Sequence, residues 1–522
     1  MRPRSAALLC TLAAALGACA APAAGPAPAA GPAPAAAGAG RHALAADAGP
    51  PAVEAIAEEE LRRDLFSLAS DAMRGREAGE LDEMRASAWV AERAREAGLL
   101  PAGDDGTYFQ FFPVRRVRTA AHSTVSLGGT ALALGRDVVV AAPVDARVDL
   151  PVVFVGEGRE ADLAGIDLRG KAAAAVLGAP NTPIAPGMSL WARRYTQAAV
   201  RDRAAFLAQR GAAAVILVSD SVAETQFEVT GSAMLRGRYS LSGGTEQRPA
   251  GQPPVLWLRR SMMDAVRAPG QRLAAGISSE SFVYPSANVV AVAQGADPAL
   301  RGEHVLFSGH QDHDGARVPV GGDSIWNGAD DNATVSVALL AIGRAFVRQP
   351  GRRSALFVWH GAEERGLLGS RWFVRHPTVA RESIAAVLNG DMIGRNHPDS
   401  AALLGSLPPH RSSGDLVAMA ERANAEVSRF VIDSSWDDPR HPEGWFFRSD
   451  HLPYACANIP SLFFTTLLHD DYHTPEDEAD RIDTAKLTRA TRWMYATGWL
   501  AAQADARPRL EPGFRLERPC NP

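Results

Sequence analysis

Five short segments in the second half of the chain combine imidazoles and carboxylates in a pattern that suits metal chemistry. They contain His310 and Asp312, Asp331, the pair Glu363 and Glu364, Asp391, and His473. Zinc binds neutral imidazole nitrogen and carboxylate oxygen, and a catalytic zinc site keeps one position open for water. Two zinc ions close together can stabilise both the attacking and the leaving oxygen of a displacement. The set therefore predicts a hydrolytic site with two zinc ions.

Taken one at a time, these residues have less specific explanations. A histidine near a strand end is usually a surface or core residue, and Asp331 lies in Asp330-Asp331-Asn332, where Asp and Asn are common helix N-caps. Capping is compatible with metal binding, and we expect Asp331 to bridge two ions through its two oxygens. Adjacent carboxylates such as Glu363 and Glu364 resist joint ionisation unless a cation is close. The combination therefore favours a metal site over five separate explanations.

The candidate residues follow short apolar runs that are typical of buried strands. The sequence predicts strands over 289–293, 304–308, 355–359, 385–388 and 461–465, and helices over 334–347 and 367–374. Alternating strands and helices indicate an α/β sheet with helices on both faces. Ligands bind at the carboxyl ends of strands in such sheets. We therefore expect residues that are distant in sequence to converge at one edge.

The first half of the chain has a different pattern. Residues 58–69 and 81–97 have helical spacing, and a polar turn over 70–76 joins them. Between 126 and 285, short Val/Ala/Leu runs alternate with Gly and Pro. The clearest strands there are 152–156, 171–176 and 213–218, with a helix over 198–211. This segment contains no cluster of His and carboxylates, so we expect a lid or docking module without catalysis.

Together these motifs resemble the di-zinc, co-catalytic aminopeptidase family of the aminopeptidase Y type. Its wider relatives include glutamate carboxypeptidase, glutaminyl cyclases and the transferrin receptor. The resemblance covers roughly residues 55–112 and 286–500. Residues 162–171 and 210–215 between them resemble a protease-associated domain inserted in a peptidase. The resemblance implies a zinc-exopeptidase fold, phosphorylase/hydrolase-like, with a mixed sheet flanked by helices and a β-rich insert.

The resemblance also implies a ligand set. One zinc would be held by His310, Asp331 and Asp391, and the other by Asp331, Glu364 and His473. Glu363 would be the general base, and Asp312 would orient the ring of His310 through its free N–H. Tyr472 matches a family tyrosine that donates to the oxyanion. Asp450, in Ser449-Asp450-His451, is expected to support the ligands from behind.

The expected activity is that of an aminopeptidase acting on peptides outside the cytoplasm. A carboxypeptidase or dipeptidase of the same fold is the main alternative, because the charged end recognised by the pocket is not evident in the sequence. A glutaminyl-cyclase-type activity is disfavoured because such enzymes use one zinc. A non-catalytic binding protein, like the transferrin-receptor relatives, would lack ligands, whereas all five are present here. The native substrate, the oligomeric state and the metal used in the cell stay open.

Composition sets further bounds. The chain has 522 residues, a formal net charge of −5, 46% hydrophobic residues and 22% charged residues. This length suits two or three cores, and the absence of a basic stripe in the sequence gives no reason to expect nucleic acid. The predicted divisions are a leader (1–19), a tether (20–50), the first peptidase part (51–125), the insert (126–285), the catalytic part (286–505) and a tail (506–522).

The N-terminus has the pattern of a targeting segment. Two arginines precede an apolar run over 6–16 that is too short to span a bilayer. The run ends in Leu16-Gly17-Ala18-Cys19, which resembles a bacterial lipobox with Cys19 as the lipidated residue. A plain secretory peptide is the alternative. Residues 20–50 are rich in Ala, Pro and Gly and suit a tether.

This leader predicts an exported protein of the bacterial cell envelope, anchored to the outer membrane or facing the periplasm, and otherwise secreted. The only contact with a membrane would then be the lipid on Cys19. An oxidising location permits a disulfide between Cys456 and Cys520. The sequence leaves open whether the two cysteines pair.

Overall fold

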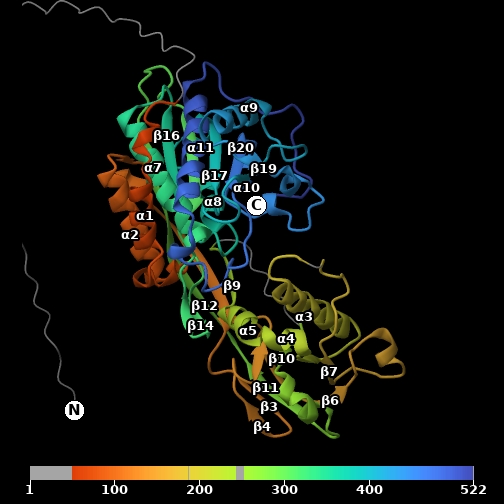
Figure 1. Cartoon of the computed structure of the whole chain (residues 1–522). Helices are drawn as coiled ribbons and strands as arrows, with labels where there is room; N and C mark the ends of the chain where they lie inside the picture. The colour runs from red at the N-terminus through yellow and green to blue at the C-terminus, as the bar shows by residue number, and fades with distance from the viewer. Residues whose placement is uncertain (1–49, 186, 243–251, 521–522) are drawn as a thin grey trace, which may run out of the picture. The chain divides into compact units, whose positions relative to one another are not determined.

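A computed structural model describes residues 50–185, 187–242 and 252–520 (Figure 1). The predicted leader, Cys19 and nearly all of the predicted tether lie outside these described residues. Within them, no helix has both the length and the apolar composition needed to cross a membrane.

The larger sheet contains the strands that position the candidate ligands. Its order is β19-β18-β20-β17-β13-β16-β12-β2-β9, with β1 paired to β12. The strands are β1 (Leu100–Pro101), β2 (Phe109–Thr119), β9 (Arg238–Leu241), β12 (Ser279–Ala293), β13 (His304–His310), β16 (Ser354–His360), β17 (Ile384–Gly390), β18 (Ser400–Leu404), β19 (Val431–Ile432) and β20 (Ser461–Thr465). The strands β16, β13, β17 and β20 are parallel, and antiparallel strands flank them. The predicted α/β mixed sheet is confirmed.

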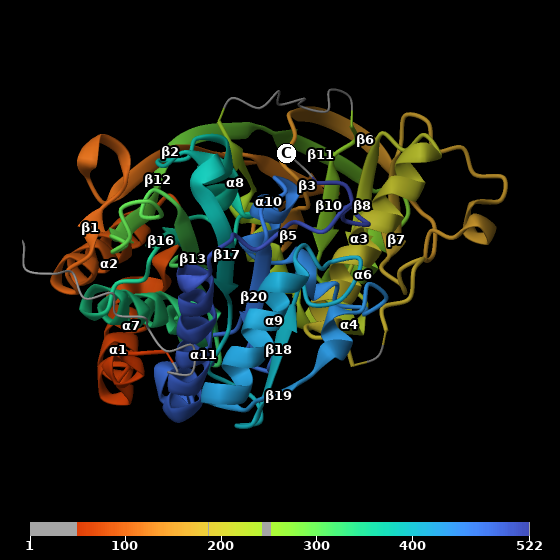
Figure 2. The ribbon, with the colours of Figure 1, turned by 90° about the horizontal axis from the view of Figure 1, so that it is seen from above.

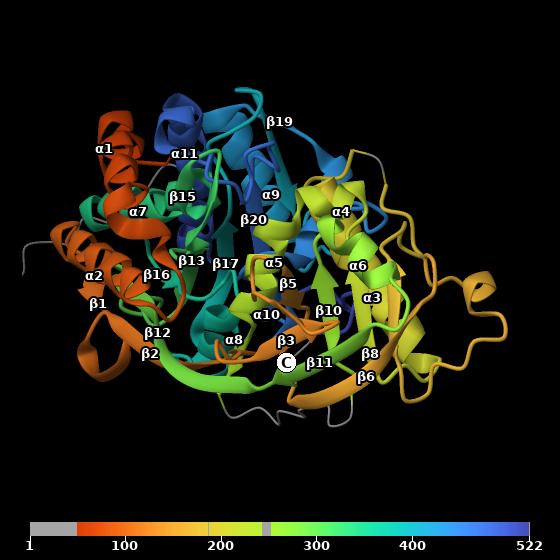
Figure 3. The ribbon, with the colours of Figure 1, turned by 90° about the horizontal axis from the view of Figure 1, so that it is seen from below.

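Helices cover both faces of this sheet (Figures 2 and 3). One face packs against α1 (Glu58–Leu68), α2 (Leu81–Glu96), α7 (Thr334–Arg348), α9 (Gly414–Ala423) and α11 (Thr484–Gln503), and the other against α8 (Leu368–Arg375) and α10 (His451–Cys456). In β13, Val305 and Phe307 face the first group, whereas Leu306 faces the second. Successive strand residues point to opposite faces. The apolar runs in the sequence are therefore strands buried on both sides.

A second sheet lies within the segment predicted to be an insert. Its order is β4-β3-β11-β6-β7-β8-β10-β5. The strands are β3 (Thr124–Leu127), β4 (Thr130–Leu132), β5 (Val138–Val140), β6 (Ala146–Phe154), β7 (Ala172–Val176), β8 (Ala214–Val218), β10 (Val255–Leu258) and β11 (Arg272–Ile277). The helices are α3 (Trp191–Gln209), α4 (Ser221–Thr225), α5 (Phe227–Arg236) and α6 (Met263–Arg267). Apolar side chains fill a core on each face of this sheet, so the segment has its own hydrophobic interior.

Two features of this segment differ from the sequence-based expectation. Helix α3 begins at Trp191 instead of near residue 198, because the polar residues of its first turns obscure the apolar spacing there. Strand β9, although it lies between 126 and 285, pairs with β2 in the larger sheet. The long strands β2 and β12 pair from Phe109 opposite Val289 to Thr119 opposite Ser279 and lead from the larger sheet toward the second one (Figure 1).

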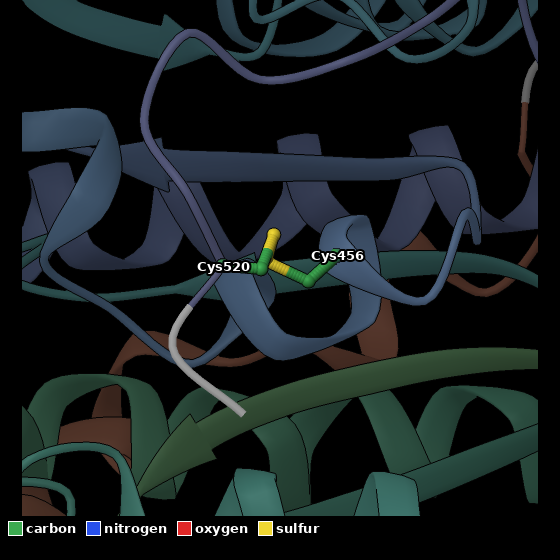
Figure 4. The surroundings of a disulfide bond; sticks show 2 residues. All are labelled: Cys456 and Cys520. Carbon is green, nitrogen blue, oxygen red and sulfur yellow. A yellow bond between two sulfur atoms is a disulfide. The ribbon is translucent and has the colours of Figure 1, made fainter.

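A disulfide fastens the C-terminal segment to the larger domain. Cys456, the last residue of α10, is bonded to Cys520, with 5.8 Å between their Cα atoms (Figure 4). The pairing that the sequence left open is therefore present. A two-stranded hairpin, β14 (Gly315–Val320) and β15 (Asp323–Trp326), follows the loop after β13.

Candidate metal centre

The predicted ligands gather at the carboxyl ends of the parallel strands. His310 is the last residue of β13, Asp391 follows β17 directly, and Glu363 and Glu364 lie in the turn after β16. Asp331 lies in the turn that precedes α7, and His473 lies in the long segment after β20. The sheet therefore brings together residues that are up to 163 positions apart, from 310 to 473.

Asp331 lies between two histidines at the centre of this group. Its Oδ1 is 3.2 Å from Nε2 of His310, and its Oδ2 is 3.0 Å from Nε2 of His473. The side chain of Asp331 is only 5% exposed. Each carboxylate oxygen thus faces a different imidazole, which is the geometry that a bridging ligand needs.

Of the other carboxylates, Asp391 and Glu363 lie near His310, and Glu364 lies near His473. Nε2 of His310 is 3.6 Å from Oδ2 of Asp391 and 3.8 Å from Oε2 of Glu363. Nε2 of His473 is 3.2 Å from Oε2 of Glu364. Two groups of buried or nearly buried N and O atoms are close enough to share an ion, His310 with Glu363 and Asp391, and Asp331 and Glu364 with a further histidine, His313.

These side chains fit a divalent cation. Within the described part of the chain, Oδ1 of Asp391 and Nε2 of His313 are buried without a hydrogen-bond partner. Burying polar atoms without partners is costly, and buried charges are normally paired or coordinate metals. Imidazole nitrogen and carboxylate oxygen are also the donor types that zinc prefers. The orphaned atoms and their chemistry together indicate a metal centre.

Burial and mutual charge set the proton affinities of the cluster. Burial raises the pKa of Glu363 well above its ordinary value, and the neighbouring Glu364 adds to this effect. Burial would also raise the pKa of Asp331, but hydrogen bonds from His310 and His473 lower it to about 2. For His473, burial opposes protonation, yet Glu364 and Asp331 raise the pKa to about 9. The proton affinities of these side chains are therefore set by the imidazoles and carboxylates that crowd one another.

Asp312 supports the turn after β16 more directly than it supports His310. Its Oδ1 accepts from the amide of Glu363 at 2.9 Å, and its Oδ2 accepts from the amide of Glu364 at 3.3 Å. The Nδ1 of His310 lies 3.1 Å from the backbone carbonyl of Asp312 and 3.8 Å from its carboxylate. One residue thus fixes both the imidazole and the pair of glutamates, with the carbonyl oxygen closest to the ring.

Asp477 holds the turn that contains Asp331. Its carboxylate accepts from the amides of Asp330 at 2.9 Å and Asp331 at 3.0 Å. Gly328 precedes this turn with φ +56°, and a Cβ there would lie 2.3 Å from Cγ of His313. Only glycine therefore allows the backbone to approach the histidine at this point. The Asp477 contact was not predicted, although Asp477 lies four residues after His473.

Arg76 connects the loop after His310 with the loop before Asp331 through hydrogen bonds to their backbones. Its guanidinium is fully buried and donates to the carbonyls of Gln311 and Asn327, both at 2.6 Å, and of Gly328 at 2.9 Å. Burial lowers its pKa to about 10, which still leaves it charged at neutral pH. Sequence reasoning treated residues 70–76 only as a polar turn. The repeated arginines of Arg74-Gly75-Arg76 are the one signal that could have drawn attention to it.

His313 and Asp314 are two more residues that sequence reasoning missed. Nδ1 of His313 is 2.9 Å from Oε1 of Glu364, and its ring meets that of His473 edge to face. Oδ2 of Asp314 is 3.7 Å from Nδ1 of His473, on the side of the ring away from Asp331. Both follow His310 within four residues, so proximity to a predicted ligand was the available signal.

Tyr472 and Asp450 are the two remaining residues that the sequence assigned to the site, and both are buried. The ring of Tyr472 packs against His473, with 3.9 Å between centroids, and its hydroxyl accepts from Arg448 at 2.8 Å. Asp450 is fully buried, and burial raises its pKa to about 7. The charge of His310 opposes this shift, and the charge of Asp391 adds to it.

The backbone beside three of these residues is left-handed. Ala362 before Glu363, Met392 after Asp391, and His473 itself have φ values of 52°, 57° and 53°. Non-glycine residues in this region cost free energy and cluster at functional sites. Ala362 and Met392 turn the chain just after β16 and β17, beside Glu363 and Asp391, whereas His473 adopts this conformation in the segment after β20.

Comparison with known proteins finds a family model that resembles this region. Residues 288–497 match the family model described as Peptidase family M28. This segment runs from within β12 to within α11 and includes every ligand named above. The segment that carries the candidate ligands is therefore similar to peptidase family M28.

Curated relatives match over part of their length. The chain is 29% identical over 189 residues to Aminopeptidase YwaD of Bacillus subtilis (strain 168), covering 35% of this chain and 39% of that protein. It is 26% identical over 212 residues to a Probable leucine aminopeptidase of Arthroderma otae, covering 38% of this chain and 55% of that protein. The chain thus spans about two fifths to just over half of the length of these relatives.

Solved structures show the same fold over most of the chain. The structure of BSAP, a zinc aminopeptidase from Bacillus subtilis, matches with a TM-score of 0.57 and 19% identity, covering 88% of this chain and 99% of that one. The aminopeptidase from Aneurinibacillus sp. strain AM-1 matches with a TM-score of 0.55 and 19% identity, covering 88% and 97%. At this identity the similarity establishes the fold.

Proposed function

We propose that this protein is a zinc-dependent exopeptidase, and specifically an aminopeptidase that removes N-terminal residues from peptides. The main support is the position of Asp331 between two groups of histidine and carboxylate ligands, with Glu363 beside them. The names of the relatives, aminopeptidases and a zinc aminopeptidase, are consistent with this activity. A carboxypeptidase or dipeptidase of the same fold is the alternative.

The proposed ligands account for two zinc ions. One set is His310, Asp331 and Asp391, and the other is Asp331, Glu364 and His473. When bound, zinc ions supply an activated water, whose pKa falls toward about 7, and polarise the scissile carbonyl. His313 is a further candidate for contact with Glu364, because its Nδ1 lies 2.9 Å from Oε1 of that glutamate.

Two side chains would perform the remaining chemistry. Glu363 accepts a proton from the attacking water at a carboxylate oxygen and then delivers it to the leaving amine. Its buried position raises its proton affinity, which suits a group that must hold a proton between two steps. The hydroxyl of Tyr472 donates to the oxyanion, and one such donor is typically worth roughly 3–4 kcal/mol in the transition state.

The deciding experiment compares two peptides of the same sequence. One has a free N-terminus and a blocked C-terminus, and the other has the reverse, each with and without chelator and added zinc. Chelator-sensitive cleavage of only the first peptide supports the aminopeptidase. Cleavage of only the second indicates a carboxypeptidase. If neither peptide is cleaved while zinc binds, the proposed exopeptidase activity is wrong.

We also propose that the second sheet is a protease-associated domain and that the protein is exported and lipidated on Cys19. The lipobox pattern Leu16-Gly17-Ala18-Cys19 supports the second proposal. Growth of the expressing bacterium with a clickable fatty acid tests it. Label on the wild-type protein and none on Cys19→Ala is the expected result, and label on both proteins would contradict lipidation at this residue.

A further inference from the structure

A continuous chain of hydrogen bonds joins the insert to Tyr472. In the insert, Ser189 and Arg194 lie at the start of α3. Both contact the carboxylate of Glu443, which also contacts Arg448. Arg448 in turn donates to the hydroxyl of Tyr472. The chain of hydrogen bonds therefore runs from a segment without catalytic residues into the candidate metal centre.

Glu443 is the middle residue of this chain of hydrogen bonds, and both of its carboxylate oxygens accept hydrogen bonds. Oε1 accepts from the amide and the hydroxyl of Ser189, each at 3.0 Å. Oε2 accepts from Arg194 at 2.6 Å and from Arg448 at 3.1 Å. The side chain is only 4% exposed. A buried carboxylate that has lost a partner is costly, so the four contacts depend on one another.

The Arg448–Tyr472 contact determines which way the tyrosine proton points. Arginine is a donor without acceptor capacity, so the oxygen of Tyr472 must be the acceptor at 2.8 Å. The hydroxyl proton of Tyr472 is then free to donate elsewhere. Arg448 is itself fixed by stacking over the ring of Trp445, 4.4 Å from its centroid. It also lies over the ring of Tyr472, 5.6 Å from its centroid, and donates to Glu443.

We infer that Glu443, held by Arg194 and Ser189 of the insert, positions Arg448 so that the Tyr472 hydroxyl is aimed at the reacting carbonyl. This inference rests on the proposed peptidase function and adds a role for the insert. Glu443, Arg194 and Arg448 are positioning residues, because they act through Tyr472. The insert thereby becomes part of the catalytic apparatus without contributing a group that touches substrate.

The first test measures the contact itself and does not depend on turnover. Hydrogen–deuterium exchange is compared between the wild type, Arg194→Met and Arg201→Met. Arg201 is the matched control, because it lies on α3 and its ion pair, among the described residues, is with the adjacent Asp202. Faster exchange of the amides of 443–448 in Arg194→Met alone is expected, with β13 unchanged. Unchanged exchange in 443–448 would overturn the inference whatever the peptide experiment shows.

The second test asks whether the contact acts through Tyr472. Glu443→Gln and Arg194→Met should lower kcat by roughly 10- to 100-fold, as expected for misplacement of a catalytic group. KM should change by less than about threefold, because the lost interaction belongs to the transition state. Zinc content and the melting temperature of each variant confirm that the protein is folded and loaded.

The same substitutions are then repeated in Tyr472→Phe. If Glu443 acts through the tyrosine, Glu443→Gln causes less than about a twofold further loss in that background. An equal loss in both backgrounds would show that Glu443 acts by another route and would overturn the inference. If the wild type cleaves neither peptide, the proposed function fails, and the exchange experiment still decides the contact.

Discussion

Glu363 is the residue whose role is most sharply testable. Its carboxylate lies 3.8 Å from Nε2 of His310, whereas the adjacent Glu364 faces His473. Glu363→Gln removes the proposed base but keeps the shape of the side chain, so we expect retained zinc and a loss of activity of roughly 100-fold or more. Glu364→Gln is the matched comparison and should lower zinc content. Near wild-type turnover in Glu363→Gln would show that another group is the base.

Arg76 has a structural role that can be separated from catalysis. Arg76→Met would leave the carbonyls of Gln311, Asn327 and Gly328 without their buried donor. Unpaired buried acceptors cost about 1–3 kcal/mol each, so the melting temperature should fall by several degrees. Zinc affinity, measured by competition with a chelating dye, should fall too. Arg85→Met is the control, because Arg85 is exposed on α2, and an equal effect in both variants would contradict the assignment.

His410 gives a pH dependence away from the metal centre. Burial alone would lower its pKa, but hydrogen bonds to Asp437 and Glu517 outweigh burial and raise it. A raised folded-state pKa stabilises the fold fully below the unfolded value of about 6.5, and the stabilisation disappears as pH rises through the folded-state value. His410→Gln should therefore lower the melting temperature more at about pH 5.5 than at about pH 9.

The exposed His122 provides a control for the substitution itself. His122→Gln should change the melting temperature little, because substitutions at exposed positions usually have small effects on stability. A larger destabilisation by His410→Gln at the alkaline pH would reverse the sign of the expected linkage and contradict the role assigned to Asp437 and Glu517.

At the scale of elements, the C-terminal segment is fastened at several points after α11 ends. Arg509 pairs with Asp415 of α9, Glu511 pairs with Arg411, and Cys520 is bonded to Cys456. The disulfide spans a sequence separation of 64, and closing a loop of this size typically stabilises a protein by about 2–4 kcal/mol. Reduction should therefore lower the melting temperature and speed proteolysis after residue 505.

The control for the disulfide is the double variant Cys456→Ser/Cys520→Ser. It should melt like the reduced wild type, and reductant should not change it further. If reductant lowers the melting temperature of both proteins equally, the effect does not come from this bond.

The secondary structure of the catalytic part was largely predictable. The predicted ends of strands β13, β16, β17 and β20 lie within about two residues of the observed ends. They were predictable because strands buried on both faces are apolar throughout. The start of α3 was not predicted correctly, because seven residues of mixed polarity precede its apolar stripe. The pairing of β9 with β2 was not predicted either, because the sequence of a four-residue strand does not indicate its partner strand.

At the scale of the whole molecule, metal should stabilise the fold. The carboxylates of Asp331, Glu363, Glu364 and Asp391 are crowded and buried, and a bound cation favours their charged forms. A ligand that binds only the folded state adds about 4 kcal/mol at a thousand times its dissociation constant. Chelator should lower the melting temperature by several degrees and zinc should restore it. No shift with zinc, or the same shift in Glu364→Gln, would contradict a stabilising role for this centre.

The sequence by itself determined which residues could bind metal and on which elements they would lie. Residue type and hydrophobic periodicity are local properties, so local patterns alone predicted His310, Glu363, Asp391 and His473 just after strands. The same patterns predicted Asp331 in a turn that opens a helix. Their settings in short, distinctive segments also pointed to the resemblance with di-zinc aminopeptidases.

Only the tertiary structure decided how those residues are held. Arg76 beneath the ligand loops, Asp477 behind the Asp331 turn, and Glu443 between the insert and Arg448 make contacts across long stretches of sequence. Each is a single polar residue that looks like a surface residue in the sequence. Its burial, and therefore the strength of its hydrogen bonds, arises only when the sheets and helices enclose it.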